Sequence, residues 1–96
     1  MKITFNPHKN ARNRQKQGID LAEIEAVFYD PYAITIEDLD HDEERFVTIG
    51  QDHLGRVVIV AYHYRGNHEL RVISARAAQR HERQHDEREA HHARTR

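Results

Sequence analysis

The chain of 96 residues has no cysteine and no tryptophan, and it contains two prolines and four glycines. Without cysteine it has no disulfides, no thiolate metal ligands and no cysteine nucleophile. No apolar run approaches the roughly 20 residues of a membrane span, and the first residues lack the hydrophobic region of a signal peptide. We therefore expect a cytoplasmic protein with no membrane contact, one modest core and a surface site.

Three common catalytic motifs are also missing from the sequence. It contains no G-x-x-x-x-G-K-[ST], no G-x-S-x-G and no G-x-G-x-x-G pattern. Phosphate-loop NTPases, serine hydrolases and dinucleotide-dependent enzymes therefore have no support.

Large apolar side chains are absent from the last twenty residues, although 21 leucine, isoleucine, valine and phenylalanine residues precede them. A helix that is polar on every face frays unless it packs against something. We predict a single domain over residues 1–83 and a polar, frayed or disordered tail over residues 84–96.

The formal net charge of −1 conceals three blocks of charge. Residues 1–18 carry five basic side chains and no acid, and residues 19–44 carry ten acids and no lysine or arginine. Residues 45–96 carry ten arginines against six acids. Such segregation predicts separate basic and acidic surfaces, the basic one suited to nucleic acid, unless the blocks neutralise each other in the fold.

Apolar spacing predicts a strand and two helices in the first third of the chain. Residues 2–5 alternate polar and apolar, as in a short strand. A helix follows over residues 7–17, between an Asn-Pro pair and Gly18, with a basic and mostly solvated surface. A second helix over residues 21–29 carries apolar residues at helical spacing and supplies a face to the core.

Four strands and a last helix complete the predicted order, β-α-α-β-β-β-β-α. The strands are expected over residues 32–37, 45–50, 57–64 and 69–75, with an acidic loop before the second of them. The nearly continuous apolar run of residues 57–64 is typical of a central strand. The predicted fold class is α+β.

A possible zinc motif lies near the C-terminus. Residues 81–85 (HERQH) match H-E-x-x-H, in which two histidines one helical turn apart bind zinc and the glutamate acts as a base. His91 follows as a third histidine, but Arg88 stands where the extended motif has a glycine that turns the chain. No large apolar side chain is present to build a dry cleft. We interpret the match as coincidental, and a zinc hydrolase is the third hypothesis.

Basic residues stand at the ends of the predicted elements or inside the last strand: Lys16, Arg45, Arg71 and Arg76. Strict alternation along that strand separates Arg71, Ile73 and Ala75 on one face from Leu70, Val72 and Ser74 on the other. Any one of these arginines, taken alone, is better explained as a solvent-facing residue or as the partner of a cross-strand acid than as a functional residue.

Five segments in order carry a more specific pattern: residues 5–10 (FNPHKN), 13–19 (NRQKQGI), 26–31 (AVFYDP), 44–50 (ERFVTIG) and 71–78 (RVISARAA). The pairs Gly55-Arg56 and Glu82-Arg83 follow at matching spacing. Over residues 1 to about 85, the chain resembles the BrnT family, the ribonuclease toxins of type II toxin–antitoxin systems.

The resemblance implies a RelE-like fold, an antiparallel sheet with two N-terminal helices and one C-terminal helix. It also implies metal-independent RNA cleavage without a cofactor. The implied partner is a BrnA-like antitoxin of the ribbon-helix-helix type, which inhibits the toxin and forms a heterotetramer with it. The complex would contact operator DNA only through the antitoxin.

The same resemblance suggests roles for individual residues. Arg45, Arg71 and Arg76 are expected to bind phosphate and stabilise the transition state of 2′-OH attack, and Lys16 to bind phosphate or act as a base. Further RNA contacts are assigned to Lys9, Arg12, Arg14 and Arg80, and reserve proton transfer to His63 and Tyr64.

The chain departs from the family at one informative position. The family's usual Lys-His-Gly reads Lys16-Gln17-Gly18 here, and glutamine cannot exchange a proton near neutral pH. This leaves a second hypothesis, a catalytically degenerate toxin that serves as an antitoxin-binding and co-repressor module.

Overall fold

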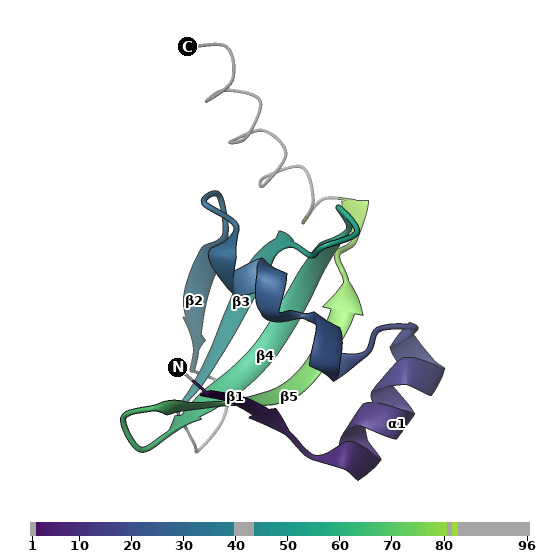
Figure 1. Ribbon diagram of the computed structural model, residues 1–96. Helices are drawn as coiled ribbons and strands as arrows, with labels where there is room; N and C mark the ends of the chain where they lie inside the picture. The colour runs from purple at the N-terminus through teal and green to yellow at the C-terminus, as the bar shows by residue number, and fades with distance from the viewer. Residues whose placement is uncertain (1, 40–43, 81, 83–96) are drawn as a thin grey trace.

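The computed structural model describes residues 2–39, 44–80 and 82 (Figure 1). Its centre is a five-stranded sheet with the strand order β1-β5-β4-β3-β2. The elements are β1 (Lys2–Phe5), α1 (Pro7–Gln17), η1 (Leu21–Glu23), η2 (Glu25–Tyr29), β2 (Ile34–Asp38), β3 (Arg45–Gln51), β4 (Val57–Arg65) and β5 (Glu69–Ala77). The predicted α+β class is confirmed.

The sheet is not entirely antiparallel. Strands β2 to β5 pair antiparallel with their neighbours, whereas β1 runs parallel to β5. The prediction of a wholly antiparallel sheet is wrong for β1. No hairpin joins β1 to its neighbour, so local turn signals do not determine its direction.

The boundaries of α1 agree with the sequence pattern. The Asn6 side chain accepts hydrogen bonds from the backbone amides of His8 and Lys9 at 2.9 and 3.3 Å. Gly18 ends the helix in the left-handed conformation, with φ of 69°, and its amide donates to the carbonyl of Arg14. Glycine adopts this conformation without the steric cost that a Cβ imposes.

The second predicted helix is instead two short 3₁₀ helices, η1 and η2, which is a correction. Leu21, Ile24 and Val27 are buried and stand three residues apart. A 3₁₀ helix has three residues per turn, so this spacing places all three on one face. The prediction that the segment supplies a core face is confirmed.

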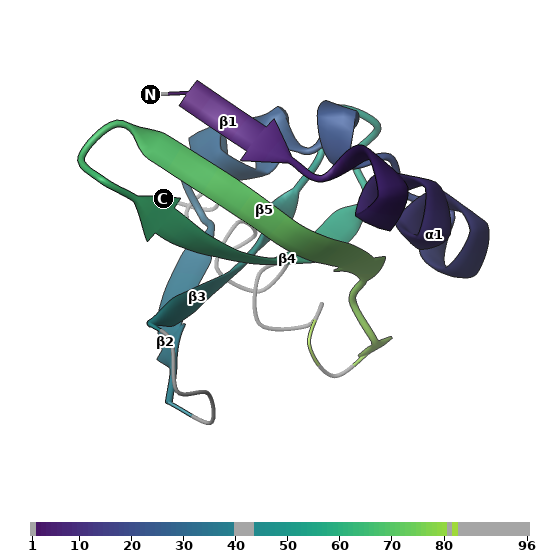
Figure 2. The ribbon, with the colours of Figure 1, turned by 90° about the horizontal axis from the view of Figure 1, so that it is seen from below.

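The core lies between this segment and one face of the sheet (Figure 1). We call this the covered face. It contributes Val58, Val60, Tyr62, Leu70, Val72 and Ala75, which pack with Ile19, Leu21, Ile24 and Val27. Figure 2 shows the segment of η1 and η2 on one side of the twisted sheet, β1 beside β5 at the edge of the sheet, and α1 beyond the end of β1.

A β-bulge interrupts the alternation along β5. Ala61 pairs with Ser74 and the next residue of β4, Tyr62, pairs with Val72, so one extra residue stands in β5. Consequently Ala75 is buried on the covered face and Ser74 is exposed on the other, which corrects the alternation expected from the sequence. A bulge changes which face the following side chains occupy.

Strand β5 continues to Ala77, so the sheet extends to the residue at which the last helix was expected to begin. The predicted tail, residues 84–96, and the histidines of the H-E-x-x-H match lie outside the described residues. Within residues 2–39, 44–80 and 82, no helix is long and apolar enough to cross a membrane.

Candidate functional site

The face of the sheet opposite the core, which we call the open face, gathers basic residues from β5. In the register, Arg71 pairs with His63, and Arg76 pairs with Ile59, four residues earlier on β4. Residues four apart on a strand share a face. Arg71 and Arg76 are five apart, and the bulge brings them to the same face.

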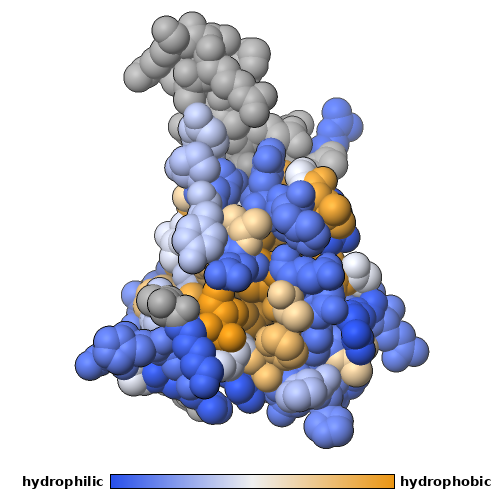
Figure 3. All heavy atoms as spheres, viewed as in Figure 1, coloured by the Kyte–Doolittle hydropathy of each residue, from blue (hydrophilic) through white to orange (hydrophobic). Residues whose placement is uncertain are grey.

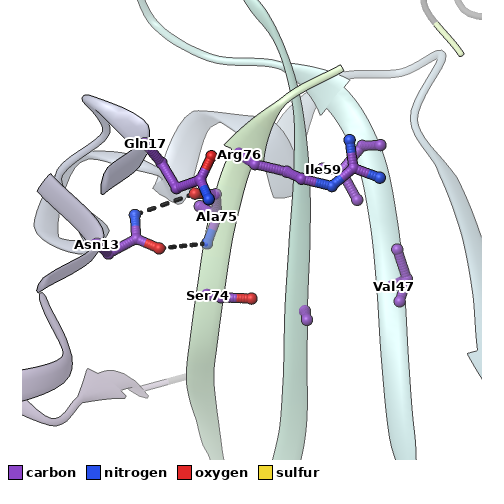
Figure 4. A pocket seen from close by; sticks show the side chains of 8 residues that line it. Asn13, Gln17, Val47, Ile59, Ser74, Ala75 and Arg76 are labelled. Atoms are coloured by element: carbon purple, nitrogen blue, oxygen red, sulfur yellow. Dashed lines mark hydrogen bonds between the residues drawn. The ribbon is translucent and has the colours of Figure 1, made fainter. Parts of the chain in front are cut away.

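A first pocket of about 230 Å³ lies on the open face, where the end of α1 meets β5. Its apolar floor comes from β3 and β4, and Gln17 and Arg76 stand at its rim (Figure 4). The Arg76 side chain extends from β5 across β4, and Gln17 projects over β5 from α1. The full lining is Asn13, Gln17, Val47, Ile59, Ala61, Ser74, Ala75 and Arg76.

A second pocket of about 410 Å³ continues the first along α1. The two share Asn13, Gln17 and Ser74, so they form one joined surface. The second adds Ile73 and the side chains of Lys9, Arg12 and Lys16, which stand three and four residues apart along one side of the helix. We call the joined surface the basic groove.

Asn13 holds α1 against the groove. It is 8% exposed, and its side chain exchanges hydrogen bonds with both backbone groups of Ala75, at 3.0 and 3.2 Å (Figure 4). It also donates to the carbonyl of Ile19 at 2.8 Å. Since β1 pairs with β5 only as far as Val72, the asparagine side chain takes the place of a neighbouring strand at Ala75.

A second buried asparagine fixes the chain that leaves α1. Asn10 donates to the carboxylate of Asp20 and accepts from the amide of Leu21, each at 2.8 Å. Hydrogen bonds from the Ala22 amide and from Asn10, with a smaller contribution from Arg14, lower the pKa of Asp20. Together the two asparagines set the position of the basic side chains of α1 relative to β5.

Arg76 is engaged by a carboxylate. Its Nη1 and Nη2 donate to the two oxygens of Glu82 at 3.0 and 2.9 Å, and the Gln79 amide donates to the same carboxylate at 2.7 Å. These hydrogen bonds to Glu82 raise the pKa of Arg76, against the opposing effect of burial. A phosphate uses the same guanidinium fork as a carboxylate, so the two compete for Arg76.

The remaining predicted site residues lie apart from the basic groove. Arg45 occupies the open face on β3, two strands from β5, and its buried Nε has no hydrogen-bond partner in the described part of the chain. Arg14 contacts Asp20 at 3.8 Å, and Arg80 is exposed and lines neither pocket.

Tyr64 lies on the covered face, because it follows the buried Tyr62 by two residues on β4. Partial burial, together with Tyr62, raises the pKa of Tyr64 above its ordinary value. The alternation on β4 separates it from His63, which stays on the open face.

Three residues of the site were not predicted as site residues, although they lie in the segments that carry the family resemblance. Asn13 and Ser74 are polar residues whose burial and direction depend on the docking of α1 and on the bulge. Glu82 was read within the zinc pattern, and in the structure it binds Arg76. Among the residues that the structure describes, no three histidine or acidic side chains gather to hold a metal ion.

An α+β protein with cationic side chains around one groove is of the class that binds a polyanion. Residues 5–82 match the family of the ribonuclease toxin BrnT of type II toxin–antitoxin systems, and the chain belongs to this family. It is therefore a ribonuclease toxin, and its partner is a cognate antitoxin.

A solved structure agrees with the family. The 1.1 Å crystal structure of the Brucella abortus ribonuclease toxin BrnT is similar to this chain, with a TM-score of 0.68 and 26% sequence identity. The similarity covers 83% of this chain and 99% of that chain. No curated protein matches the sequence.

Proposed function

We propose that the chain is an endoribonuclease that cleaves RNA without a metal ion, with the basic groove as its active site. The observation that carries this proposal is the joining of two pockets, which places Lys9, Arg12 and Lys16 of α1 on one surface with Arg76 of β5. A row of cations on a concave surface follows a phosphate backbone and makes binding dependent on salt.

The reaction uses a nucleophile that RNA itself supplies. A base removes the proton from the 2′-OH, O2′ attacks the adjacent phosphorus, and the 5′-oxygen leaves as it takes a proton from an acid. The products are a 2′,3′-cyclic phosphate and a 5′-hydroxyl. In this scheme the protein supplies alignment, proton transfer and positive charge at the phosphate, so a metal is not required.

Arg76 and Lys16 are assigned to the scissile phosphate, because they flank the groove from β5 and α1. Arg71 and Arg45 extend the positive charge across the open face toward the flanking phosphates. His63 lies opposite Arg71 and not opposite Arg76, so it stays a reserve candidate for proton transfer, and Lys16 is the candidate base at the scissile phosphate. Lys9 and Arg12 are assigned to RNA binding.

RNA has to replace Glu82 on Arg76 in this proposal. The carboxylate already satisfies both terminal nitrogens of the guanidinium, in the paired arrangement that a phosphate adopts. Without substrate, Glu82 thus occupies the phosphate-binding side of Arg76. When RNA binds, its phosphate replaces the Glu82 carboxylate.

The wider biology follows from the family. We infer a RelE-like fold, a BrnA-like antitoxin of the ribbon-helix-helix type, a toxin–antitoxin heterotetramer, and contact with operator DNA only through the antitoxin. We also keep the prediction of a single toxin domain over residues 1–83, with a tail that cleavage does not require.

The test is cleavage of a defined RNA by the antitoxin-free protein in excess EDTA. We expect cleavage to continue in EDTA and to fall by about 100-fold or more in Arg76→Ala, the size of effect that follows loss of one group stabilising the transition state. Arg65→Ala is the matched control, because Arg65 is exposed at the end of β4 and outside the groove. Loss of cleavage in EDTA, or equal loss in both variants, contradicts the proposal.

A degenerate toxin is the second candidate, and the position of Gln17 favours it. Gln17 lines both pockets of the groove, at the place where the family resemblance has a histidine. If the wild-type chain does not arrest growth when expressed alone and Gln17→His does, the natural chain is a binding module. Arrest by both variants supports the active enzyme.

A further inference from the structure

A third pocket lies on the opposite side of the sheet from the basic groove. It measures about 330 Å³ and is lined mainly by Ile3, Phe28, Tyr29, Tyr62, Tyr64 and Leu70. These residues come from β1, η2, β4 and β5, beyond the part of the covered face that η1 and η2 fill. Figure 3 shows hydrophobic surface gathered low on this side of the molecule.

Two tyrosines stand exposed at this pocket, which we call the aromatic pocket. Tyr29 is 74% exposed and Tyr64 is 46% exposed. Tyr64 is held by edge contacts with Tyr62 and Phe46, with ring centroids 5.8 and 5.5 Å apart. A tyrosine fixed by its neighbours loses little conformational entropy on binding, and exposed aromatic side chains dominate the energy of protein interfaces.

The hydroxyl of Tyr62 is already satisfied inside the core. It is 2.8 Å from the hydroxyl of Thr48, which is in turn 2.8 Å from that of Thr35. The polar groups beneath the pocket therefore have partners in the chain. What the pocket offers to another molecule is apolar and aromatic surface.

The charge around the aromatic pocket is acidic. Among the described residues, the strand positions on the covered face hold no lysine or arginine, and they include Glu37, which pairs with Phe46. The segment of η1 and η2 carries Glu23 and Glu25 and no basic residue, and Glu25 accepts a hydrogen bond of 3.5 Å from Tyr29. A polyanion is repelled here, whereas a cationic protein segment is attracted.

We propose that the aromatic pocket is the docking site of the cognate antitoxin, and that it receives an apolar side chain from a segment carrying lysine or arginine. The type II family supplies the partner, and Glu25 and Glu37, beside the pocket, supply the charge complementarity. This site is separate from the proposed RNA groove, so the antitoxin binds one face of the sheet while the other carries the chemistry.

The experiment measures the affinity of the full chain for its cognate antitoxin, by calorimetry at two salt concentrations. We expect Tyr64→Ser to weaken binding by about tenfold or more, as loss of an interface anchor does. Glu37→Lys should weaken binding most at low salt, because screening reduces the effect of a rim charge. The matched control is Ile36→Ser, at a residue 56% exposed on the open face of β2, which should bind as the wild type does.

Several results would overturn this proposal. If Ile36→Ser weakens binding and Tyr64→Ser does not, the antitoxin docks on the open face. If the wild-type toxin alone is a dimer and Tyr64→Ser is a monomer, the pocket binds a second copy. Deletion of residues 84–96 that tightens antitoxin binding identifies the chain's own tail as the occupant. RNA cleavage by Tyr64→Ser without antitoxin is assayed separately, so a failure of the ribonuclease proposal is recognised independently.

Discussion

The two faces of the sheet are built from the same strands and differ in charge and in what covers them. The covered face packs under η1 and η2, and at its strand positions the described residues include no lysine or arginine. The open face presents Arg45, Arg71 and Arg76, and α1 adds Lys16 beside them. The lysines and arginines of the strands thus lie on the open face, together with Asp38 and Glu69.

In the two proposals, this difference lets a small chain bind both RNA and its antitoxin. RNA binds a basic surface, and the proposed antitoxin segment, which carries lysine or arginine, binds an acidic one. Segregating the charges by face lets one sheet present both surfaces, and strand alternation is the simplest way to separate them. The bulge in β5 is the local feature that keeps Arg71 and Arg76 together on the open side.

The largest change in stability is expected at the junction that positions the basic groove. Asn13→Ala leaves both backbone groups of Ala75 and the carbonyl of Ile19 without their partner. We expect the free energy of unfolding to fall by about 3 kcal/mol, from several buried groups left unsatisfied. Urea denaturation measures this, and the neighbouring Arg12→Ala, at an exposed position, should change stability by less than about 0.5 kcal/mol.

The covered and open faces should also differ in the cost of losing apolar side chains. Val60→Ala removes two methyl groups from a fully buried site on β4. We expect the free energy of unfolding to fall by about 2 kcal/mol. Val47→Ala, at the half-buried floor of the groove, should cost about 1 kcal/mol or less. Thermal and urea denaturation compare the two, and equal losses would show that the open face is covered in solution.

A site away from both faces provides a pH test. Burial alone would raise the pKa of Asp52, but hydrogen bonds from Arg56 and from the Leu54 amide outweigh it and lower the pKa. The folded state therefore favours the charged carboxylate, and its contribution is present above the ordinary pKa near 3.8 and lost as the pH falls through the lowered value.

Asp52→Asn should accordingly lower the free energy of unfolding by about 1.5 kcal/mol at pH 7, which is the net contribution of hydrogen bonds to a charged group. The difference from the wild type should shrink below about pH 4. Denaturation curves recorded from pH 7 to pH 3 measure it. A difference that stays constant over this range would show that the charge of Asp52 does not contribute.

The smallest predicted effect concerns the ion pair between Arg76 and Glu82 at the rim of the basic groove. Glu82→Gln removes the charge that holds Arg76 and should tighten RNA binding by about three- to tenfold, a typical value for one phosphate competitor. Glu44→Gln is the control, because it removes one exposed negative charge at another place. Weaker RNA binding in Glu82→Gln would mean that Glu82 supports the site instead of closing it.

Local patterns predicted much of the fold. The limits of β1 and α1, and the central position of β4, follow from alternation, capping residues and apolar runs. The 3₁₀ helices did not follow, because Leu21, Ile24 and Val27 fit a period of 3.6 almost as well as a period of three. The direction of β1 depends on its pairing with β5, for example Lys2 with Glu69, 67 residues later, and no local signal specifies it.

The candidate site was predicted less completely, for two physical reasons. The sequence identifies the arginines as candidates for phosphate binding. Strict alternation along β5 is wrong after the bulge, however, so only the observed register shows that Arg71 and Arg76 share a face. The helix α1 was expected to be solvated, since its buried residues are the polar Asn10 and Asn13. A helix that packs against the sheet through polar side chains shows no hydrophobic periodicity in its sequence.

The most direct test of the division between the two faces is NMR mapping with an RNA oligonucleotide that lacks the 2′-OH at the cleavage site. The account predicts amide shift changes in α1 and around Ser74 and Arg76, and none at Tyr29, Glu37 or Tyr64. Shift changes centred on the aromatic pocket, with the basic groove unaffected, would contradict it.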